Sequence, residues 1–355
     1  MEPVTHFLAG ACMGRAGLNR KTAYATLAAT LAAEAADLDV VWSLAGPVAA
    51  LKHHRGITHT FWAVPVVAGV VVGAIWLYNR WRPQRPNAQP VHWGWLYLTA
   101  FVAALSHLLL DWTNNYGVRP FFPFNAHWYA GSFMFIAEPV LWALFFLAFV
   151  MPWLLALADR EIGARQKNFR GQGWAIFALC GMLILGCLRW SEHARALTML
   201  NDTPITSESA LRAAAEPYPI NPFHWHGIVE TADFYQTAEI DTRTGAMESD
   251  PRQNVLFKPS WTPSVETAKH TPLGQVYLDW GSWAVVRDLG QQPIPGLAPP
   301  QLAPLRSWTT VGFSDLRFDY AYLPARRREH LLSGMVYVVD GREEAGAMLN
   351  GKIQK

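Results

Sequence analysis

The chain has 355 residues, of which 51% are hydrophobic and only 16% are charged. That balance, together with 17 tryptophans, is unusual for a soluble enzyme and typical of a polytopic membrane protein with a soluble part. The formal net charge of +2 is too small to indicate a nucleic-acid partner. The three cysteines all lie in apolar segments and therefore indicate neither a disulfide framework nor a zinc–thiolate site.

Two short apolar segments begin the chain, at residues 4–14 and 22–36. Both are rich in small residues, and the basic turn RAGLNRK separates them. Small residues let helices approach closely, so we expect a short helical hairpin packed against the other helices. The first residues, MEPVTHFLAGACMG, carry no basic region ahead of the apolar stretch, and we therefore expect no cleavable signal peptide.

Four further apolar segments have the length and composition of membrane spans: residues 60–78, 93–110, 139–158 and 174–188. With the short hairpin they make about six membrane helices, and three basic loops then fall on one side. The basic residues of these loops are Arg15, Arg20 and Lys21, then Arg80, Arg82 and Arg85, then Arg160, Arg165, Lys167 and Arg170. The positive-inside rule places that side in the cytoplasm, so the other loops, the N-terminus and everything after Arg189 are expected outside.

After Trp190 the composition changes to prolines, threonines and acidic residues, with no further apolar run long enough to span. Residues 234–247 read as strand, turn and strand, and residues 275–289, 316–324 and 334–342 are further alternating or β-rich segments. We therefore expect two domains: a membrane-embedded helical domain at 1–190, and at 191–355 a helical lead-in followed by a small antiparallel β-rich domain outside the membrane. The loop 217–226 carries His224 and His226, which are either incidental surface histidines or contacts to the membrane or the site.

The densest group of metal-ligand side chains is HHRGITHT, at residues 53–60. The neutral imidazoles of His54 and His59 suit zinc or another transition metal, and Arg55 offers an anion clamp. Gly56 would permit the sharp bend that turns both rings inward. The expected topology places this stretch at the outer membrane interface, where a metal site would reach a substrate at the membrane surface.

Two further pairs of potential metal ligands fall at the same expected face of the membrane. Asp37 and Asp39 end the second helix, and His107 and Asp111 form an i, i+4 pair on one side of a span. Each group alone has a structural alternative: capping or solvation of a helix end for the aspartates, a buried hydrogen bond for the pair, and a lipid-headgroup contact for HHRGITHT. Ionisable residues are costly inside a membrane, so their joint placement at one face favours a shared site.

As an ordered set, these motifs resemble the family of membrane-bound, metal-dependent hydrolases typified by YdjM and YbcI, whose members show an N-terminal TH, an acidic pair, HRGxTHS and HxxxD followed by YG and a proline-phenylalanine motif. The resemblance covers roughly the first 160 residues. The departures are Ala36 in place of a proline, Thr60 in place of a serine, and Glu138 before Pro139 where an aspartate is common. The arrangement is also distantly similar to zinc-dependent phospholipase C. The matching residues are Thr5, His6, Asp37, Asp39, His54, Arg55, Gly56, Thr58, His59, His107, Asp111, Tyr116, Gly117, Pro123 and Phe124.

The resemblance implies a metal-dependent hydrolase of the cytoplasmic membrane. The interfacial position of the site, among aromatic residues such as Trp112 and Tyr116, favours a lipid or lipid-linked substrate, with phosphoester cleavage preferred over ester or amide cleavage. Arg55 would neutralise developing charge, and Glu138 or an unliganded Asp39 would move the proton. The metal is expected to be zinc, with manganese or iron as alternatives, in a cluster of one, two or more ions. A metal-stabilised sensor, scaffold or binding protein is the main alternative, and a transporter is less favoured because no repeat symmetry is visible. The expected metal ligands are His6, Asp37, Asp39, His54, His59, His107 and Asp111.

Overall fold

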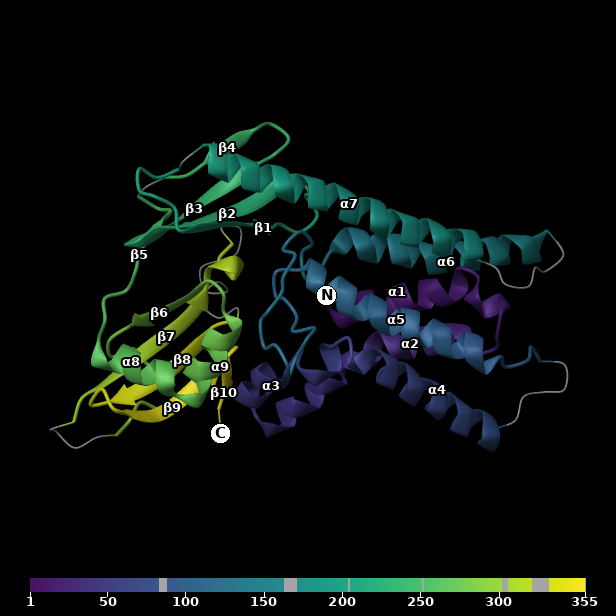
Figure 1. Cartoon of the computed structure of the whole chain (residues 1–355), viewed down its shortest axis with the longest axis horizontal. Coiled ribbons are helices and arrows are strands. Elements are labelled where there is room, and N and C mark those ends of the chain that lie inside the picture. The colour runs from purple at the N-terminus through teal and green to yellow at the C-terminus, as the bar shows by residue number, and fades with distance from the viewer. Residues whose placement is uncertain are drawn as a thin grey trace. The chain divides into compact units, whose positions relative to one another are not determined.

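The computed structural model describes residues 1–82, 88–162, 171–203, 205–250, 252–301, 306–320 and 332–354. The chain divides into two compact units (Figure 1). Four of the basic residues used to orient the spans, Arg85, Arg165, Lys167 and Arg170, lie outside the described residues. The first unit comprises Met1–Asp39, Arg55–Arg195 and Pro217–Trp225, and the second Val40–His54, Ala196–Glu216 and His226–Lys355.

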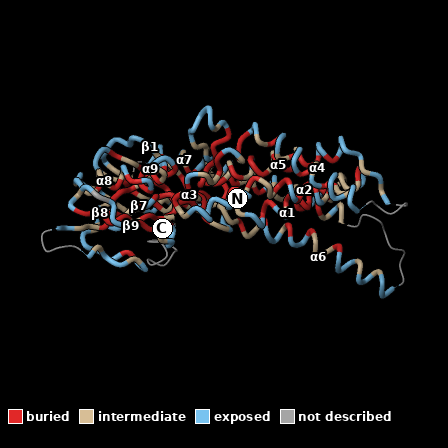
Figure 2. The backbone as a smooth tube through the Cα atoms, turned by 90° about the horizontal axis from the view of Figure 1, so that it is seen from below, coloured by how far each residue is buried: buried red, intermediate tan, exposed pale blue. Residues whose placement is uncertain are grey.

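Four described helices are long and apolar enough to cross a membrane, which confirms the predicted spans. Between 17% and 39% of each apolar segment is buried within the protein, so most of the side chains on these helices are available to lipid (Figure 2). The last helix continues past the apolar segment, as the predicted helical lead-in requires. The four are α4 (Ala63–Trp81), α5 (Trp93–Thr113), α6 (Pro139–Glu161) and α7 (Gln172–Asp202).

The two short helices, α1 (Pro3–Arg15) and α2 (Ala25–Glu34), pack closely against each other. At 13 and 10 residues they are about 20 and 15 Å long, shorter than the hydrocarbon core of a bilayer. A Cβ atom added at Gly10 would lie 2.7 Å from the carbonyl oxygen of Ala29, and one at Gly14 would collide with the backbone of Thr26. Glycine is therefore required on α1 because the two backbones nearly touch, as the small-residue composition predicted.

The core of the first unit is built from small and branched residues of α2, α4 and α5. Alanines of α2 face α5. Because alanine is small, the C-terminal end of the α2 backbone comes close to the C-terminal half of α5. The chain leaves α2 directly into the 3-10 segment η2 (Ala35–Ala45), and the 3-10 turn η3 (Ile57–His59) precedes α4. These connections bring the predicted ligand segments to the C-terminal end of α5.

The second unit contains two five-stranded sheets, and the pairings described within them are antiparallel, which confirms the predicted β-rich region. The first sheet has the order β1-β2-β3-β4 with β5 on β3, and the second has the order β10-β9-β8-β7-β6. The strands are β1 (Arg212–Pro217), β2 (His224–Glu230), β3 (Phe234–Asp241), β4 (Ala246–Glu248), β5 (Val255–Phe257), β6 (Ala284–Asp288), β7 (Trp308–Asp315), β8 (Gly334–Val339), β9 (Glu343–Leu349) and β10 (Lys352–Ile353).

Parts of the predicted β segments are wrong. Residues 275–280 belong to helix α9 (Pro272–Trp280), not to a strand. The hydroxyl of Thr271 accepts the backbone N–H of Gly274, and a proline occupies the first turn, so the helix has a well-made start. Helix α8 (Pro263–His270) precedes it, and α3 (Pro47–His53) is the unit's third short helix. The alternating pattern at 275–280 was misleading because its buried residues also fit helical spacing.

Two other predicted segments differ in detail. Residues 316–318 form the 3-10 turn η4 (Leu316–Phe318), and residues 321–324 lie outside the described residues. His224 and His226 belong to strand β2 and not to a loop. The His226 ring is buried, and its Nδ1 lies 3.2 Å from a carboxylate oxygen of Glu239, a contact within the sheet.

One ion-pair group ties the first sheet together. The carboxylate of Glu230 on β2 accepts hydrogen bonds from Arg212 and from Lys258, whose Nζ is 2.7 Å away. Burial raises the pKa of this carboxyl, but the two cations outweigh that effect and hold the pKa below its usual value.

Candidate metal centre

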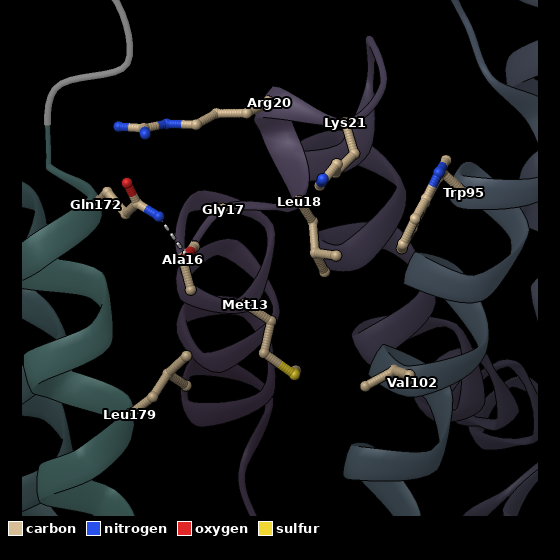
Figure 3. Close-up of a pocket in the computed structure, with 10 residues that line it drawn as sticks. All are labelled: Met13, Ala16, Gly17, Leu18, Arg20, Lys21, Trp95, Val102, Gln172 and Leu179. Carbon is tan, nitrogen blue, oxygen red and sulfur yellow. Dashed lines mark hydrogen bonds between the residues drawn. The ribbon is translucent and has the colours of Figure 1, made fainter.

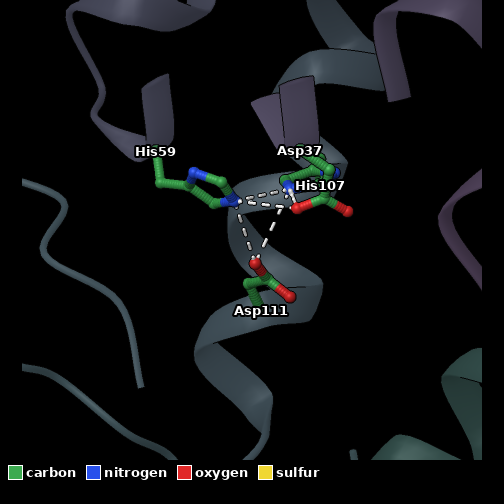
Figure 4. A group of neighbouring side chains, drawn as sticks. All are labelled: Asp37, His59, His107 and Asp111. Carbon is green, nitrogen blue, oxygen red and sulfur yellow. Dashed lines mark hydrogen bonds and ion pairs between the residues drawn. The ribbon is translucent and has the colours of Figure 1, made fainter. Parts of the chain in front are cut away.

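Four of the seven predicted ligands meet at one point in the first unit (Figure 4). Asp37 comes from the first turn of η2, His59 ends η3, and His107 and Asp111 lie one turn apart on α5. Each offers one ligand atom, and these four atoms all lie within 4.8 Å of one another. His59, His107 and Asp111 are buried, whereas 17% of the Asp37 side chain is exposed. Asp37 is therefore the one of these four side chains that solvent partly reaches.

The hydrogen bond behind His107 decides which of its nitrogens can bind a metal. Its Nδ1 lies 2.6 Å from the backbone carbonyl oxygen of Ala33, near the end of α2. A carbonyl oxygen can only accept, so Nδ1 carries the proton and Nε2 presents its lone pair. That nitrogen faces the other three ligands. A carbonyl that fixes the tautomer in this way is the usual support for a metal-binding histidine.

The spacing of the four atoms fits one tetrahedral ion. Nε2 of His59 is 3.0 Å from Nε2 of His107 and 3.3 Å from oxygens of both Asp37 and Asp111. Nε2 of His107 is 3.7 and 3.6 Å from the same two oxygens. Ligands held about 2.0 Å from a zinc ion stand about 3.3 Å apart at the corners of a tetrahedron. The five distances that involve the two histidines, from 3.0 to 3.7 Å, are thus near the tetrahedral value, and the two aspartate oxygens lie within 4.8 Å of each other.

Asp111 uses its two oxygens for different purposes. Oδ1 accepts a hydrogen bond from Arg55 Nη2 at 2.8 Å, lies 3.2 Å from His6 Nε2, and contacts the terminal amine of Met1. Oδ2 is buried and has no hydrogen-bond donor among the described residues, although two imidazole nitrogens face it. A buried carboxylate oxygen without a donor is costly, and a divalent cation bound there would remove that cost.

Asp39 lies behind His59 and holds the loop that carries it. Its Oδ2 is 3.4 Å from His59 Nδ1 and accepts the backbone N–H of Arg55 at 2.8 Å. A carboxylate at Nδ1 favours the proton on that nitrogen and leaves Nε2 for the metal. The backbone of Arg55 has a φ of 52°, in the left-handed region, and Gly56 has a φ of −83° and a ψ of −127°, outside the helical and extended regions, so the expected bend includes both residues. The bond to Asp39 holds the strained Arg55 in place.

The remaining predicted residues lie around the four ligands or apart from them. His6 stacks on His107, with ring centroids 3.8 Å apart. Arg55 is buried, and besides Asp111 it donates to the carbonyl of Gly117 at 2.8 Å, so its guanidinium positions a ligand. Burial lowers the pKa of Arg55 to about 10, which leaves it charged at neutral pH. His54 belongs to the second unit, at the end of α3, and its predicted ligation stays a prediction.

Glu138 forms a separate ion pair. Its Oε2 accepts a hydrogen bond from Arg189 Nη2 at 2.6 Å, and its Oε1 accepts the backbone N–H of Ile220 at 3.2 Å. Both charged side chains are fully buried. Burial raises the pKa of Glu138, and Arg189 offsets part of that effect. The pair joins the start of α6 to α7, and the predicted role of Glu138 as a ligand or base stays a prediction.

Sequence reasoning missed several supporting residues. Arg189 is expected from the sequence only as the flank of a span, although an arginine that directly follows the apolar part of a helix is also a signal for a buried acidic partner. Asn114 accepts hydrogen bonds from both Arg55 Nη1 and the backbone of Tyr116. An asparagine directly after an HxxxD helix offered no signal of its own. The carbonyl of Ala33 could not have been found from side-chain chemistry at all.

Large apolar side chains are exposed beside the ligand segments. Ile57, Phe61 and Trp62 flank His59 in the chain and are 65%, 40% and 54% exposed, and Phe124 is 82% exposed. Trp62 and Phe124 make an edge-to-face contact with ring centroids 5.7 Å apart. Exposed aromatic residues near helix ends are typical of the membrane–water interface. The candidate centre therefore has an apolar border of the kind that contacts lipid.

A family model described as YdjM inner membrane protein matches residues 1–196, more than half of the chain and all four ligands. The chain belongs to this family. As a YdjM-family protein it is an inner membrane protein, and the family description names no activity. The chain is also similar to "Uncharacterized protein YfhP" of Bacillus subtilis (strain 168), with 28% identity over 149 residues. That alignment covers 40% of this chain and 43% of the relative, less than half of each. No solved structure matches the chain.

Proposed function

We propose that this protein is a metal-dependent hydrolase of the cytoplasmic membrane that cleaves a phosphoester in a lipid or lipid-linked substrate. One observation carries the proposal: Asp37, His59, His107 and Asp111 converge with the spacing of a tetrahedral ligand set. Mixed imidazole and carboxylate ligands suit zinc, and manganese and iron accept the same donors. A divalent ion bound by these residues would supply a Lewis acid.

The chain's own residues would orient and polarise this site. His107 is held by the carbonyl of Ala33, and His59 by Asp39, so both rings are fixed before an ion binds. Arg55 neutralises one oxygen of Asp111 and leaves the other directed at the ligands. The partial exposure of Asp37, 17% of its side chain, would mark the side from which a substrate enters. A second ion, which the seven predicted ligands would permit, remains part of the proposal.

The apolar border supports a lipid substrate. Ile57, Phe61 and Trp62 surround the loop that carries His59, so a scissile group would approach from the membrane interface. The preference for a phosphoester rests on the resemblance of the HxxxD pair to that of zinc-dependent phospholipases, which is an analogy of site pattern. An outer location for the site rests on the positive-inside argument. A reporter fused after Lys355 tests it, and activity of a cytoplasm-only reporter would overturn it.

A second function has its own support. Four protein ligands complete a tetrahedral zinc site, and structural zinc sites are closed in this way. In that case the metal would hold the helices together and the protein would act as a sensor, scaffold or binding protein. The partial exposure of Asp37 favours the hydrolase, because a carboxylate at an open edge can make room for a substrate.

The test combines elemental analysis with a turnover screen on the detergent-purified full chain. A variant with His59→Ala and His107→Ala is compared with His127→Ala, which removes an exposed imidazole outside the cluster. We expect stoichiometric metal in the wild type and the His127 variant, none in the double variant, and parallel loss of turnover on phosphodiester and phosphomonoester lipids. Metal loss without any turnover in the wild type would favour the structural site. Wild-type protein that stays metal-free after addition of zinc and manganese would refute both functions.

A further inference from the structure

A cavity of about 540 Å³ lies between α1, η1 (Leu18–Arg20), α5 and α7, all in the first unit (Figure 3). Trp95, at its rim, precedes His107 on α5 by twelve residues, or about 18 Å of helix, and Val102, at its inner end, precedes His107 by five residues, or about 8 Å. None of the ten described residues that line it is acidic. The cavity therefore has no ligand set for a cation and is separate from the site described above.

The cavity has a cationic end and an apolar end. Figure 3 shows Arg20 and Lys21 at one end, with Met13, Val102 and Leu179 toward the other. Both cationic side chains are exposed. Two positive charges above an apolar cleft are complementary to an anion that carries a hydrocarbon chain.

Trp95 and the polar groups of Gln172 and Ala16 fit the same kind of ligand. Nζ of Lys21 lies 5.7 Å from the centroid of the Trp95 ring, so the indole and the ammonium form one edge of the opening. Gln172 donates to the carbonyl of Ala16 at 3.0 Å. Gly17 has a φ of 143°, and a Cβ atom there would press on that amide at 3.0 Å. Because the amide of Gln172 and the carbonyl of Ala16 bond to each other, the cavity offers polar contacts chiefly at the cationic end.

The depth of these residues matches the layers of a bilayer. Trp95 stands in the first turn of α5, at the level where tryptophans and basic residues border lipid headgroups. Val102 follows seven residues later, about 10 Å deeper along the helix. Val102 is 42% exposed, on a helix face that is open to lipid. In a bilayer, the charged headgroups lie at the surface and the acyl chains lie deeper, which is the same order as that of Trp95 and Val102 along α5.

We propose that this cavity binds an anionic phospholipid, with its phosphate between Arg20 and Lys21 and one acyl chain along Met13, Val102 and Leu179. The site is a lipid-recognition site on the basic side of the protein and takes no part in the proposed hydrolysis. A free phosphate ion would contact the two cations but leave the apolar half unfilled, so the two ligands can be separated by experiment.

The test measures lipid binding to the purified full chain by native mass spectrometry, with phosphatidylglycerol and phosphatidylcholine added in turn. We expect the wild type to retain phosphatidylglycerol preferentially. Each cation near an anionic lipid contributes about a five-fold preference. A variant with Arg20→Gln and Lys21→Gln should therefore bind phosphatidylglycerol about 25-fold more weakly than the wild type. The matched control, Arg80→Gln with Arg82→Gln, removes the same charge from another basic segment and should bind as the wild type does. Equal losses in both variants would show general charge attraction and overturn the proposal.

A second variant separates lipid from free phosphate. Val102→Trp changes no charge and fills the apolar end, so it should weaken phosphatidylglycerol binding while leaving any effect of inorganic phosphate unchanged. If excess inorganic phosphate displaces the lipid fully from the wild type and Val102→Trp binds normally, the site is an anion site without an acyl-chain groove, and the proposal is wrong. The far-ultraviolet circular dichroism spectrum, measured on the same samples, reports whether each variant has kept its fold.

Discussion

Gly10→Ala is expected to destabilise the protein, although alanine is the better helix former. The added Cβ would lie 2.7 Å from both the carbonyl oxygen of Ala29 and the Cβ of Ala33 on α2. Neither atom can rotate away, because one is backbone and the other is attached directly to it. Ordinary contact requires at least about 3.4 Å, so α1 and α2 must separate by roughly 0.7 Å. Overpacking of this kind costs about 1–3 kcal/mol.

The same displacement reaches the metal centre. The carbonyl of Ala33 accepts the proton of His107 Nδ1 at 2.6 Å. A shift of roughly 0.7 Å would lengthen that bond beyond the usual range for N–H···O. His107 then loses the contact that fixes its tautomer, and loss of such a support weakens metal binding about 10- to 100-fold. Gly10→Ala should therefore reduce stability and metal affinity together.

The control is Gly69→Ala on α4, where an added Cβ meets nothing within 4 Å. There only helix propensity acts, and it favours alanine by up to about 1 kcal/mol. The free energy of unfolding, measured for both variants in detergent, should fall for Gly10→Ala and stay level or rise for Gly69→Ala. Metal content after dialysis against a weak chelator gives the second readout. Equal stability in the two variants, or unchanged metal content in a destabilised Gly10→Ala, would refute the close-packing argument.

Three further changes test other contacts. Asp39→Asn should weaken metal binding about 10- to 100-fold in an equilibrium titration because it removes the carboxylate behind His59, and unchanged affinity would exclude that role. Arg189→Met should cost about 3 kcal/mol in unfolding experiments by leaving Glu138 buried without its cation, and adding Glu138→Leu should recover most of that loss. The folded-state pKa of Glu230 lies below its ordinary 4.5, so the stability it contributes is present above pH 4.5 and is lost as the pH falls through the lowered pKa. A Glu230→Gln variant should unfold without that acid dependence, and identical pH curves would contradict the assignment.

The sequence predicted the membrane helices well because their signals are local. A run of about twenty apolar residues has few alternatives to a span, and an i, i+4 pair such as His107 and Asp111 must share one face of a helix. The close packing of α1 on α2 followed from composition for the same reason, because the small side chains of glycine and alanine allow two helix backbones to approach closely. These inferences require only the residue types and the helical period.

Which polar residues form the ligand set and which support it could not be predicted from the sequence. Seven candidate ligands were expected, and the structure gathers four of them. Of the other three, His6 and Asp39 contact or support those four, and His54 belongs to the second unit; Arg55, which was expected as an anion clamp, also supports the four. A histidine or aspartate is equally suited to bind an ion or to hold a neighbour that does. Which role each residue takes depends on where its side-chain atoms lie, and therefore on where α2 ends against α5.

The misassigned segment at residues 275–280 fails for a related reason. Its aromatic and β-branched residues favour a strand on propensity, whereas Thr271 and Pro272 provide the start of a helix. Tyr277 and Trp280 are buried and lie three apart, a spacing that suits one face of a helix. Tertiary packing of two large aromatic side chains outweighed the local preference.

The candidate centre is built so that its least stable parts carry two of its ligands. His107 and Asp111 lie on a long helix, but Asp37 and His59 lie on 3-10 segments, which have poorer hydrogen-bond geometry than an α-helix. Asp39 and Arg55 compensate by tying these segments to each other and to α5. An ion that bridged all four ligands would add a link between the same segments. Metal binding should therefore stabilise the loop around His59 far more than it stabilises α5, and hydrogen exchange measured with and without metal should show protection concentrated at residues 55–60.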